Sequence, residues 1–303
     1  MTDYPKTILE FRDRFATEDA CREFVAQVRW PDGPRCICGS TEVWHRSRGL
    51  FLCIKCRRDI SVTAGTLFGD THLPLRLWFE AMWHVTSQKY GASALGVQRV
   101  LGLGSYHTAW SWLQKLRRAM VRPGRDRLVG TVEVDEIVIG GVREGKRGRG
   151  AEGKTLVLVA AQQAERGIGR IRLRRVADAS QASLEPAVSE MVESGSVVKT
   201  DGWGGYNGLQ ALGYQHEVIR PAVETGDNLL PMVNRIAALV KRWLLGTHQG
   251  AVAFSHLEYY LDEYVFRFNR RTSKSRGLLF LRLMEQAVQI PPVRNSALHE
   301  KTD

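Results

Sequence analysis

The sequence predicts an α/β protein whose mixed sheet is flanked by helices and preceded by a small cysteine-rich module and a helical region. Four cysteines lie close together between residues 36 and 56, amphipathic runs fill 74–122, and from residue 128 apolar residues recur with the period of strands. These changes divide the chain into five segments: a helical lead-in (1–30), the cysteine-rich module (31–70), the helical region (71–125), the α/β domain (126–275) and a C-terminal tail (276–303).

The composition is that of a folded, strongly basic protein. The 303 residues are 44% apolar, and the 43 Lys and Arg outnumber the 32 Asp and Glu by 43 − 32 = 11. Such a balance favours a polyanionic partner, usually nucleic acid. No apolar run approaches the roughly 18 residues of a spanning helix, and the N-terminus is too polar for a signal peptide. We therefore expect a cytoplasmic protein that does not associate with membranes.

Cysteines of a cytoplasmic protein are more often metal ligands or free thiols than disulfides. Four of the five fall into two close pairs around a short strand-like segment: Cys36, Cys38, Cys53 and Cys56. Two such pairs are how a zinc ribbon places four thiolates around Zn²⁺. The second pair has the usual C-x-x-C spacing, whereas the first is one residue shorter. Either the short turn is distorted and still binds zinc, or His45 or Cys21 replaces one ligand; unmetallated cysteines are the remaining alternative. The nearby basic residues suit phosphate contact: Arg46, Arg48, Lys55, Arg57 and Arg58.

The helical region contains a candidate helix-turn-helix at 94–120, where a glycine-containing turn separates two helical patterns. In that motif the second helix enters the major groove of DNA. We expect Trp110 and Leu113 to pack inward. The outward side would offer four polar residues: Ser105, His107, Gln114 and Lys115. Simple packing of a helical hairpin explains the same pattern equally well.

Strand-like segments follow from residue 128. The expected order is three strands (130–141, 155–162 and 169–178), a helix (180–195), two further strands (196–203 and 214–219) and two helices (229–245 and 255–269). Three strands in a meander, then a helix and a parallel fourth strand, is the order of the ribonuclease H fold. That fold pairs its first strand with its fourth. We therefore expect the strands 130–141 and 196–203 to lie side by side.

Acidic residues lie on both of these strands. In GTVEVDEIVIGG, Glu133 and Asp135 share a face, and Asp201 ends the strand SVVKTDGW. A carboxylate inside a sheet is costly unless it is paired or binds a metal. Asp135 and Asp201 on neighbouring strands would offer the oxygen ligands that Mg²⁺ (or Mn²⁺) prefers. The alternative is that they are solvated acids at strand ends.

Several other polar residues are expected to have lesser roles. We interpret Glu133 and Glu136 as supporting or solvent-facing acids, and His216 as structural. The basic, glycine-rich segment 142–154 suits an extended turn that grips DNA. The strongest C-terminal basic cluster suits the phosphate backbone or a solvated helix end: Arg267, Arg270, Arg271, Lys274 and Arg276.

Six motifs make the chain resemble a known family: CICGSTEVW, CRRDISVTAGTLF, GLGSYHTAW, GTVEVDEIVIGG, VKTDGWGGYNGL and HLEYYLDEYVFRFNRR, in that order. They are similar to those of bacterial insertion-sequence transposases of the ISXO-like type, over roughly residues 10–275. The resemblance implies an N-terminal zinc ribbon and a ribonuclease H-like DDE domain. It implies that Asp135 and Asp201 are the first two metal-binding acids. It also implies that the ribbon and the helix-turn-helix bind the terminal inverted repeats of the element.

The third acid departs from the family pattern. The usual Glu lies on a helix ahead of a Lys-Arg pair, whereas here position 234 is Asn. Asn234 lies seven residues, or two helical turns, before Lys241, so the two share a face. An Asn oxygen can bind Mg²⁺ without charge, which predicts weaker binding of a second metal, and Lys241 would steady a phosphate. Glu224 and Asp227 are alternative ligands, and Asn234 could instead be an ordinary surface residue.

The resemblance implies a transposase that cleaves the element's ends and transfers them to target double-stranded DNA, acting as a homo-oligomer on DNA. The catalytic set would be Asp135, Asp201, Asn234 and Lys241. The departure at Asn234 and the short cysteine turn leave a second reading, a catalytically degenerate DNA-binding protein such as a repressor. A generic nuclease is a third, weaker reading. The sequence of the inverted repeats does not follow from these residues.

Overall fold

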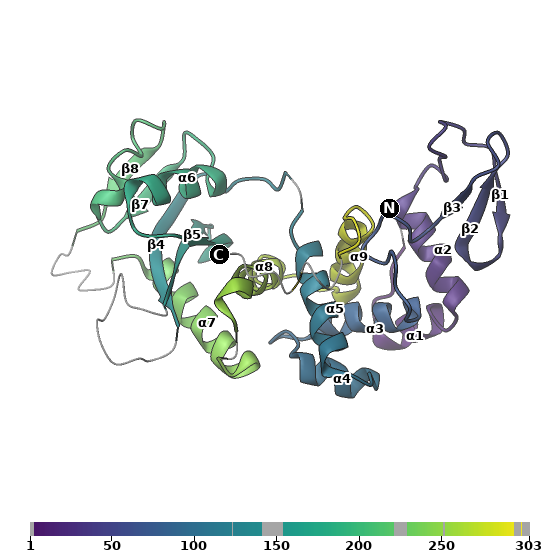
Figure 1. Cartoon of the computed structure of the whole chain (residues 1–303). Helices are drawn as coiled ribbons and strands as arrows, with labels where there is room; N and C mark the ends of the chain where they lie inside the picture. Colours follow the sequence, from purple (N-terminus) through teal and green to yellow (C-terminus); the bar gives the residue numbers. More distant parts are fainter. Residues whose placement is uncertain are drawn as a thin grey trace. The chain divides into compact units, whose positions relative to one another are not determined.

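The computed structural model divides the chain into two compact units, residues 1–122 with 272–302, and residues 123–271 (Figure 1). It describes residues 3–122, 124–140, 154–220, 229–250, 252–293 and 298. Within these residues, no helix combines the length and the apolarity needed to cross a bilayer. The boundary near residue 123 agrees with the expected change from helices to strands.

The first unit holds the cysteine-rich module and the helical region. Its described strands are β1 (Val43–Arg46), β2 (Leu50–Cys53) and β3 (Asp59–Ser61), and its helices are α1 (Ile8–Arg14), α2 (Glu18–Arg29), α3 (Leu75–Ser87), α4 (Ala94–Leu101), α5 (Tyr106–Ala119) and α9 (Arg276–Ala287). The strands form an antiparallel sheet in the order β1-β2-β3. Side-chain oxygens of Thr17, Ser93 and Ser105 cap the first turns of α2, α4 and α5, which explains where these helices begin.

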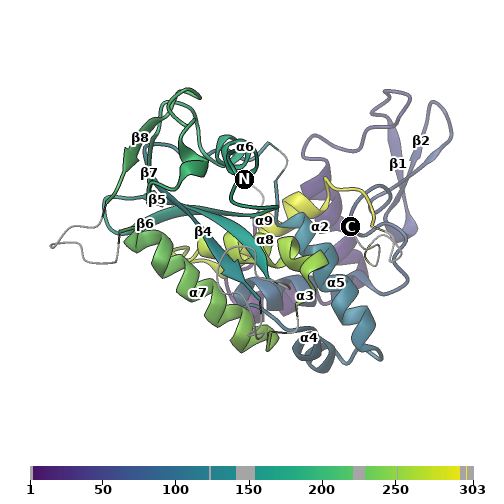
Figure 2. The same ribbon diagram turned by 60° about the vertical axis from the view of Figure 1, so that its left-hand side comes forward.

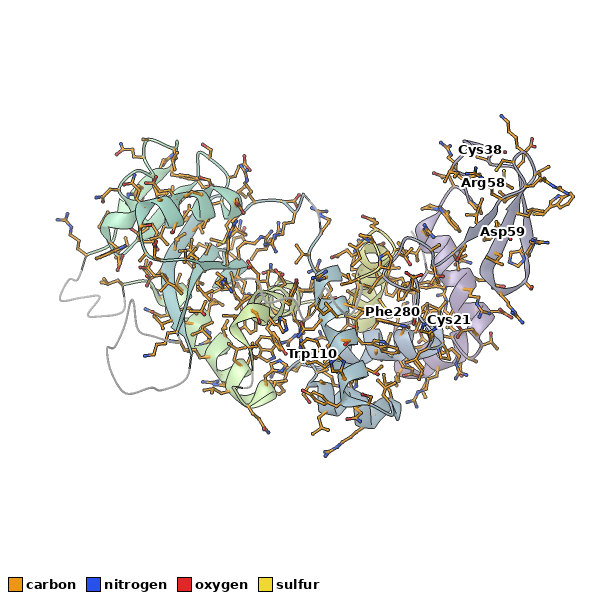
Figure 3. All side chains as sticks on the ribbon, viewed as in Figure 1. Cys21, Cys38, Arg58, Asp59, Trp110 and Phe280 are labelled. Atoms are coloured by element: carbon orange, nitrogen blue, oxygen red, sulfur yellow. The ribbon has the colours of Figure 1, made fainter. Side chains whose placement is uncertain are left out.

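Helix α9 corrects one expectation. Residues 276–303 were expected to form a tail, but 276–287 are helical, and α9 packs against α2, α3 and α5. Its Phe280 is fully buried and lies among the rings of five aromatic residues: Phe11, Phe15, Phe24, Phe79 and Trp83 (Figure 3). The C-terminal segment therefore completes the core of the N-terminal unit. Helix α9 lies far along the chain from α2 and α3, so the only sequence signal for its packing is its own amphipathic pattern.

The second unit has the predicted fold class. Its described strands are β4 (Thr131–Ile139), β5 (Thr155–Gln163), β6 (Ile168–Val176), β7 (Val197–Thr200) and β8 (Gln215–Val218), and its α-helices are α6 (Gln181–Met191), α7 (Pro231–His248) and α8 (Leu257–Phe268). The strands lie in the order β6-β5-β4-β7-β8. β4 pairs antiparallel with β5 and parallel with β7, so the first strand pairs with the fourth. This mixed sheet with flanking helices is ribonuclease H-like.

The two faces of this sheet bury different helices. Val132 and Val134 of β4 join the core that includes α6, whereas Ile137 and Ile139 join the core formed with α7 and α8 (Figure 2). The strict alternation along β4 follows from the pleat. Glu133 and Asp135 lie at odd positions, so they point toward the face covered by α7 and α8.

The C-terminal arginines of this unit are largely occupied by the fold. Arg271 donates to the backbone oxygens of Ile168, Gly169 and Phe268, and Arg267 pairs with the buried Glu263. The Asn269 side chain accepts from the backbone N–H of Ile171 and donates to its carbonyl oxygen, covering the edge strand β6. Such coverage prevents pairing of the edge with another chain. The guanidinium groups of Arg267 and Arg271 thus hold α8 and the sheet edge, whatever contact with DNA they also make.

Candidate zinc and catalytic sites

The ribbon brings the four predicted cysteines together. The Sγ atoms of Cys36, Cys38, Cys53 and Cys56 all lie within 4.8 Å of one another. Cys36 and Cys56 are 3.4 Å apart and Cys38 and Cys53 are 3.6 Å apart. A tetrahedron with Zn–S bonds of about 2.3 Å has sulfur–sulfur edges of about 3.8 Å. The four thiols therefore fit a structural zinc ion.

The short first turn is accommodated by its hydrogen bonding. In the second turn the N–H of Arg57 bonds to the carbonyl of Cys53, four residues back, whereas in the first the N–H of Gly39 bonds to Cys36, three residues back. In each turn the donor follows the second cysteine and has a positive φ, 61° at Arg57 and 85° at Gly39. The first turn is therefore one residue tighter than the second, which accommodates the shorter spacing between Cys36 and Cys38.

The substitutes considered for the zinc ligands are not part of this cluster. Cys21 lies on α2, away from Cys38 (Figure 3), and is fully buried. Burial raises the pKa of the Cys21 thiol to about 12, so it is inert at neutral pH. The N–H of Cys56, by contrast, donates to the Cys53 thiol and lowers its pKa. His45 is an exposed residue of β1 that packs edge-on against Phe51.

The helix-turn-helix pattern is present, but its outward face differs from the expectation. Helix α4 ends at Gly102, which has φ 62°, and α5 begins after the cap Ser105. Ser105 and His107 are exposed as expected, whereas Gln114 is only 1% exposed, so its outward assignment is wrong. Buried residues dominate α5 beyond its first turn. Only that first turn therefore presents several exposed polar side chains.

Asp135 lies on β4, and Asp201 directly follows the neighbouring strand β7. The parallel ladder pairs Glu133 with Lys199, and β7 ends at Thr200. If that register continued by two residues, Asp201 would come opposite Asp135. In open α/β sheets, ligand sites form at the carboxyl ends of strands. Asp201 thus directly follows the end of β7, the strand that pairs with the one carrying Asp135.

The electrostatics agree with this proximity. Burial raises the pKa of the Tyr206 phenol, and the negative charge of Glu136 raises it further. Asp135 and Asp201 act on it in the same direction, which places both within electrostatic range of one hydroxyl. Two like charges gathered this way favour a cation between them. The pair thus has the donor chemistry of a divalent metal site.

Backbone donors orient each carboxylate. An oxygen of Asp135 accepts from the N–H of Glu136, and an oxygen of Asp201 accepts from the N–H of Trp203, forming a tight turn after β7. The Thr200 hydroxyl, next to Asp201, bonds to Nε2 of His216 on β8 and accepts from the N–H of Gly202. His216 thus supports the loop, as expected of a structural histidine.

Gly202 is required by the turn that holds Asp201. Its φ is 83°, and an added Cβ would lie 2.6 Å from the Val218 side chain. We predict that Gly202→Ala lowers the free energy of unfolding by roughly 1–2 kcal/mol, because a Cβ is disfavoured at positive φ. The matched control is Gly204→Ala, where an added Cβ meets only an Asn207 nitrogen at 3.8 Å. Urea unfolding measures both, and equal losses would refute the assignment.

Asn234 and Lys241 lie on the exposed side of α7, consistent with their spacing of two turns. Asn234 follows Met232 and Val233, whose N–H groups bond to Glu133 on β4. Lys241 lines a cavity of about 280 Å³ with Val138, Ile139 and Gly140 at the far end of β4. α7 therefore runs along β4, with Asn234 near its start and Lys241 beyond Asp135. Glu224 and Asp227 lie outside the described residues, as do residues 142–153 of the basic segment.

Sequence reasoning undervalued the other two acids of β4. Glu133 is 6% exposed and bonds to α7, and Glu136 accepts from the Tyr206 hydroxyl in the loop after Asp201. The interpretation of Glu133 as solvent-facing is therefore wrong. Its partners are about 100 residues away in sequence, and the one local signal was a carboxylate at a core-facing strand position.

Comparison with known proteins assigns the segments that carry these sites to two domain families. Residues 127–269 match the model of the ISXO2-like transposase domain, and residues 16–59 match that of the transposase zinc-ribbon domain. The chain belongs to the ISXO2-like transposases. It is also 28% identical over 281 residues, 84% of this chain and 91% of the relative, to a protein of Halobacterium salinarum described as an uncharacterized protein in transposable element ISH50. The DDE domain implies phosphoryl transfer on DNA, and the ribbon match agrees with zinc at the four cysteines.

Proposed function

We propose that this ISXO2-like transposase cleaves the terminal inverted repeats of its own element and joins them to target DNA. The observation that supports the proposal is the parallel register of β4 and β7, which pairs Glu133 with Lys199 and, if it continued by two residues, would bring Asp201 opposite Asp135. The two carboxylates would hold Mg²⁺ (or Mn²⁺), with the Asn234 amide oxygen as an uncharged third ligand. Bound there, two such ions would stabilise the attacking and leaving oxygens of a phosphodiester displacement.

The chain's own residues account for the remaining requirements. Lys241, further along α7, would hold a DNA phosphate beyond the carboxylates, and the basic excess of the chain would draw DNA to it. Water first attacks the phosphodiester at the element end and releases a 3′-hydroxyl. That hydroxyl then attacks a target phosphodiester, so one bond forms as another breaks, without a covalent protein intermediate. The ribbon and the first turn of α5 would read the inverted repeats, with more than one copy bringing two ends together.

A strand-transfer assay tests this proposal. We expect the full-length protein, given labelled DNA with the ends of its own element and Mg²⁺, to nick that DNA and join it to a target duplex. Ends with a scrambled repeat should not react, and EDTA should stop the reaction. Binding without cutting would support the degenerate repressor favoured by the uncharged Asn234. Cutting without joining or end specificity would instead indicate a nuclease.

A further inference from the structure

Helix α7 takes the cap of its first turn from another element. Its first residue is Pro231, which has no N–H, and Leu230 at the cap position offers no side-chain acceptor. The free N–H groups of Met232 and Val233 bond instead to one oxygen of Glu133, at 2.8 and 3.1 Å. A helix N-terminus attracts a negative charge because its N–H groups and its dipole point toward it. Glu133 therefore supplies the cap that the sequence around Pro231 lacks.

Glu133 is buried, so its carboxylate needs the partners that these contacts supply. Burial raises the pKa of the Glu133 carboxyl, and the N–H groups of Val233 and Met232 act against that rise, as does the charge of Lys199. A carboxylate buried to 6% exposure costs free energy unless such partners compensate it. An apolar residue would bury more cheaply at this position of β4, as Val132 and Val134 do on the other face. What the carboxylate adds is a fixed connection between the strand and the helix.

That connection joins two parts of the proposed metal site. Glu133 lies two residues before Asp135 on the same face of β4, a step of about 6.6 Å along a strand. Val233, which it holds, immediately precedes Asn234. One carboxylate thus links the strand of the first ligand to the helical turn of the proposed third ligand. The link is short. On β4, Glu133 lies two residues from Asp135, and on α7, Val233 lies one residue from Asn234.

We infer that Glu133 is a positioning residue, which fixes the first turn of α7 on β4 and so sets Asn234 at the level of Asp135. The inference rests on the proposed function in one respect, which is that Asn234 binds the metal. The attachment of α7 by Glu133 can be measured independently of any reaction on DNA.

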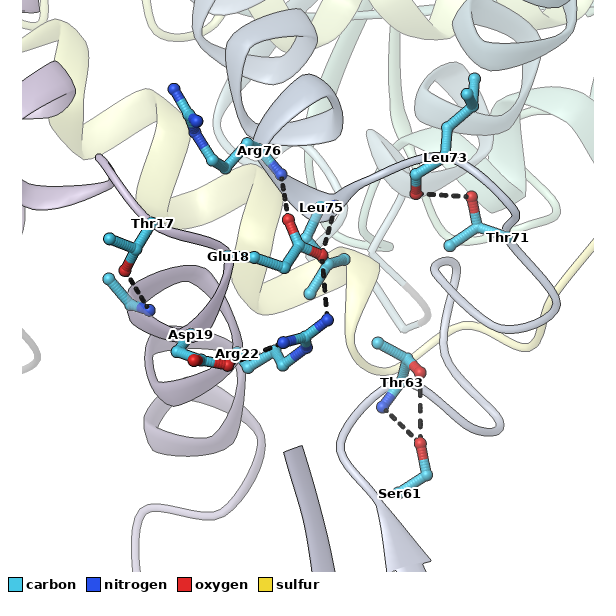
Figure 4. Close-up of polar contacts among 11 residues, drawn as sticks. Thr17, Glu18, Asp19, Arg22, Ser61, Thr63, Thr71, Leu73, Leu75 and Arg76 are labelled. Carbon is cyan, nitrogen blue, oxygen red and sulfur yellow. Dashed lines mark hydrogen bonds and ion pairs between the residues drawn. The ribbon is translucent and has the colours of Figure 1, made fainter. Parts of the chain in front are cut away.

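The chain offers a matched control in its other unit. Glu18 on α2 accepts from the N–H groups of Leu75 and Arg76 at the start of α3 (Figure 4). It too caps a helix from a distant position, 57 residues away for Leu75. Glu18→Ala therefore removes a cap of the same kind far from β4 in sequence and outside its unit. It controls for the general loss of a helix cap.

Hydrogen exchange of the full chain tests the contact itself. We expect Glu133→Ala to speed exchange at the N–H groups of Met232 and Val233 about fivefold, the usual effect of losing a cap. Glu133→Gln keeps an acceptor oxygen and should exchange within about twofold of wild type. Glu18→Ala should speed exchange at Leu75 and Arg76 only. Unchanged exchange at Met232 and Val233 in Glu133→Ala would overturn the inference.

A double-mutant cycle with Mn²⁺ alone as the probe tests the route of the effect. Glu133→Ala is expected to weaken Mn²⁺ binding about tenfold, as loss of a residue supporting a metal ligand does, with Glu133→Gln close to wild type. Adding Glu133→Ala to Asn234→Ala should then weaken binding little further, because both changes remove the same ligand. Fully additive losses, or a loss in Glu133→Gln as large as in Glu133→Ala, would show that Glu133 acts directly by its charge.

These outcomes separate the inference from the proposed function. If the wild-type protein binds Mn²⁺ and shows the expected cycle but joins no DNA, the proposed function fails and the positioning role stands. If it joins DNA while the cycle is additive, the positioning role fails and the proposed function stands. Should Glu133→Ala not fold, Glu133→Met preserves the side-chain volume without an acceptor and is expected to behave as Glu133→Ala does; wild-type behaviour of Glu133→Met would overturn the inference.

Discussion

Replacing Asp135 or Asp201 with alanine is expected to abolish cleavage at the element ends and leave their binding nearly intact. In the proposed site each carboxylate supplies its own metal ligand, so neither would substitute for the other. When the residues of a catalytic set act as a unit, removing one of them lowers the rate roughly ten-thousandfold or more. Binding should persist because the proposed repeat-reading elements, the ribbon and α5, belong to the other compact unit.

The measurement pairs a cleavage time course in Mg²⁺ with a gel-shift titration on the same labelled end. Glu165→Ala, an exposed acid in the turn between β5 and β6, is the control for loss of one negative charge. It should cleave and bind as wild type does. Wild-type cleavage by either aspartate variant would show that the metal-site assignment is wrong. A large loss of binding in both would point to a structural role for the pair.

Removal of zinc is expected to unfold the ribbon and to abolish specific end binding, while the ribonuclease H-like unit stays folded. The three short strands bury little besides Cys53, so the small sheet has almost no apolar core of its own. Structural zinc supplies the folding free energy of such modules. Cys53→Ser should therefore lower zinc from one ion per chain to none and weaken end binding by at least about tenfold.

Zinc content is measured by metal analysis of the purified full-length protein, and end binding by the same gel-shift titration. Cys21→Ala is the matched control, because Cys21 is a buried cysteine outside the four-thiol cluster. It should retain one zinc ion per chain even if it lowers overall stability through the cavity it leaves. A Cys53→Ser protein that keeps its zinc, or that binds ends as wild type does, would contradict the assignment.

Much of the fold could be predicted because its signals are local. The period of two along β4 and β5, the amphipathic helices and the cysteine pairs are each written within a few residues. The strand order then implied the pairing of the first and fourth strands, and hence the proximity of Asp135 and Asp201. The short Cys36–Cys38 turn stayed open at that stage, because only the backbone hydrogen bond of Gly39 shows how it closes.

The errors share one cause, which is that they concern contacts between distant segments. Gln114 was placed outward on helical spacing, yet it is buried. Residues 276–287 were read as a tail, although they carry the ring of Phe280 into the N-terminal core. A side chain's type predicts what it can bond to and leaves open which segment will be beside it.

The sequence by itself predicted the fold class, the cluster of four cysteines and the pairing of the strand of Asp135 with the strand that precedes Asp201, because periodicity, spacing and strand order are properties of neighbouring residues. Only the tertiary structure decided what the other acids of β4 do. Glu133 and Met232 are 99 residues apart, and Tyr206 is 70 residues from Glu136. Such contacts exist only after the chain has closed long loops around a sheet. The free energy that offsets the cost of closing those loops comes from burial of the whole core. A short motif therefore does not reveal which distant residues will meet.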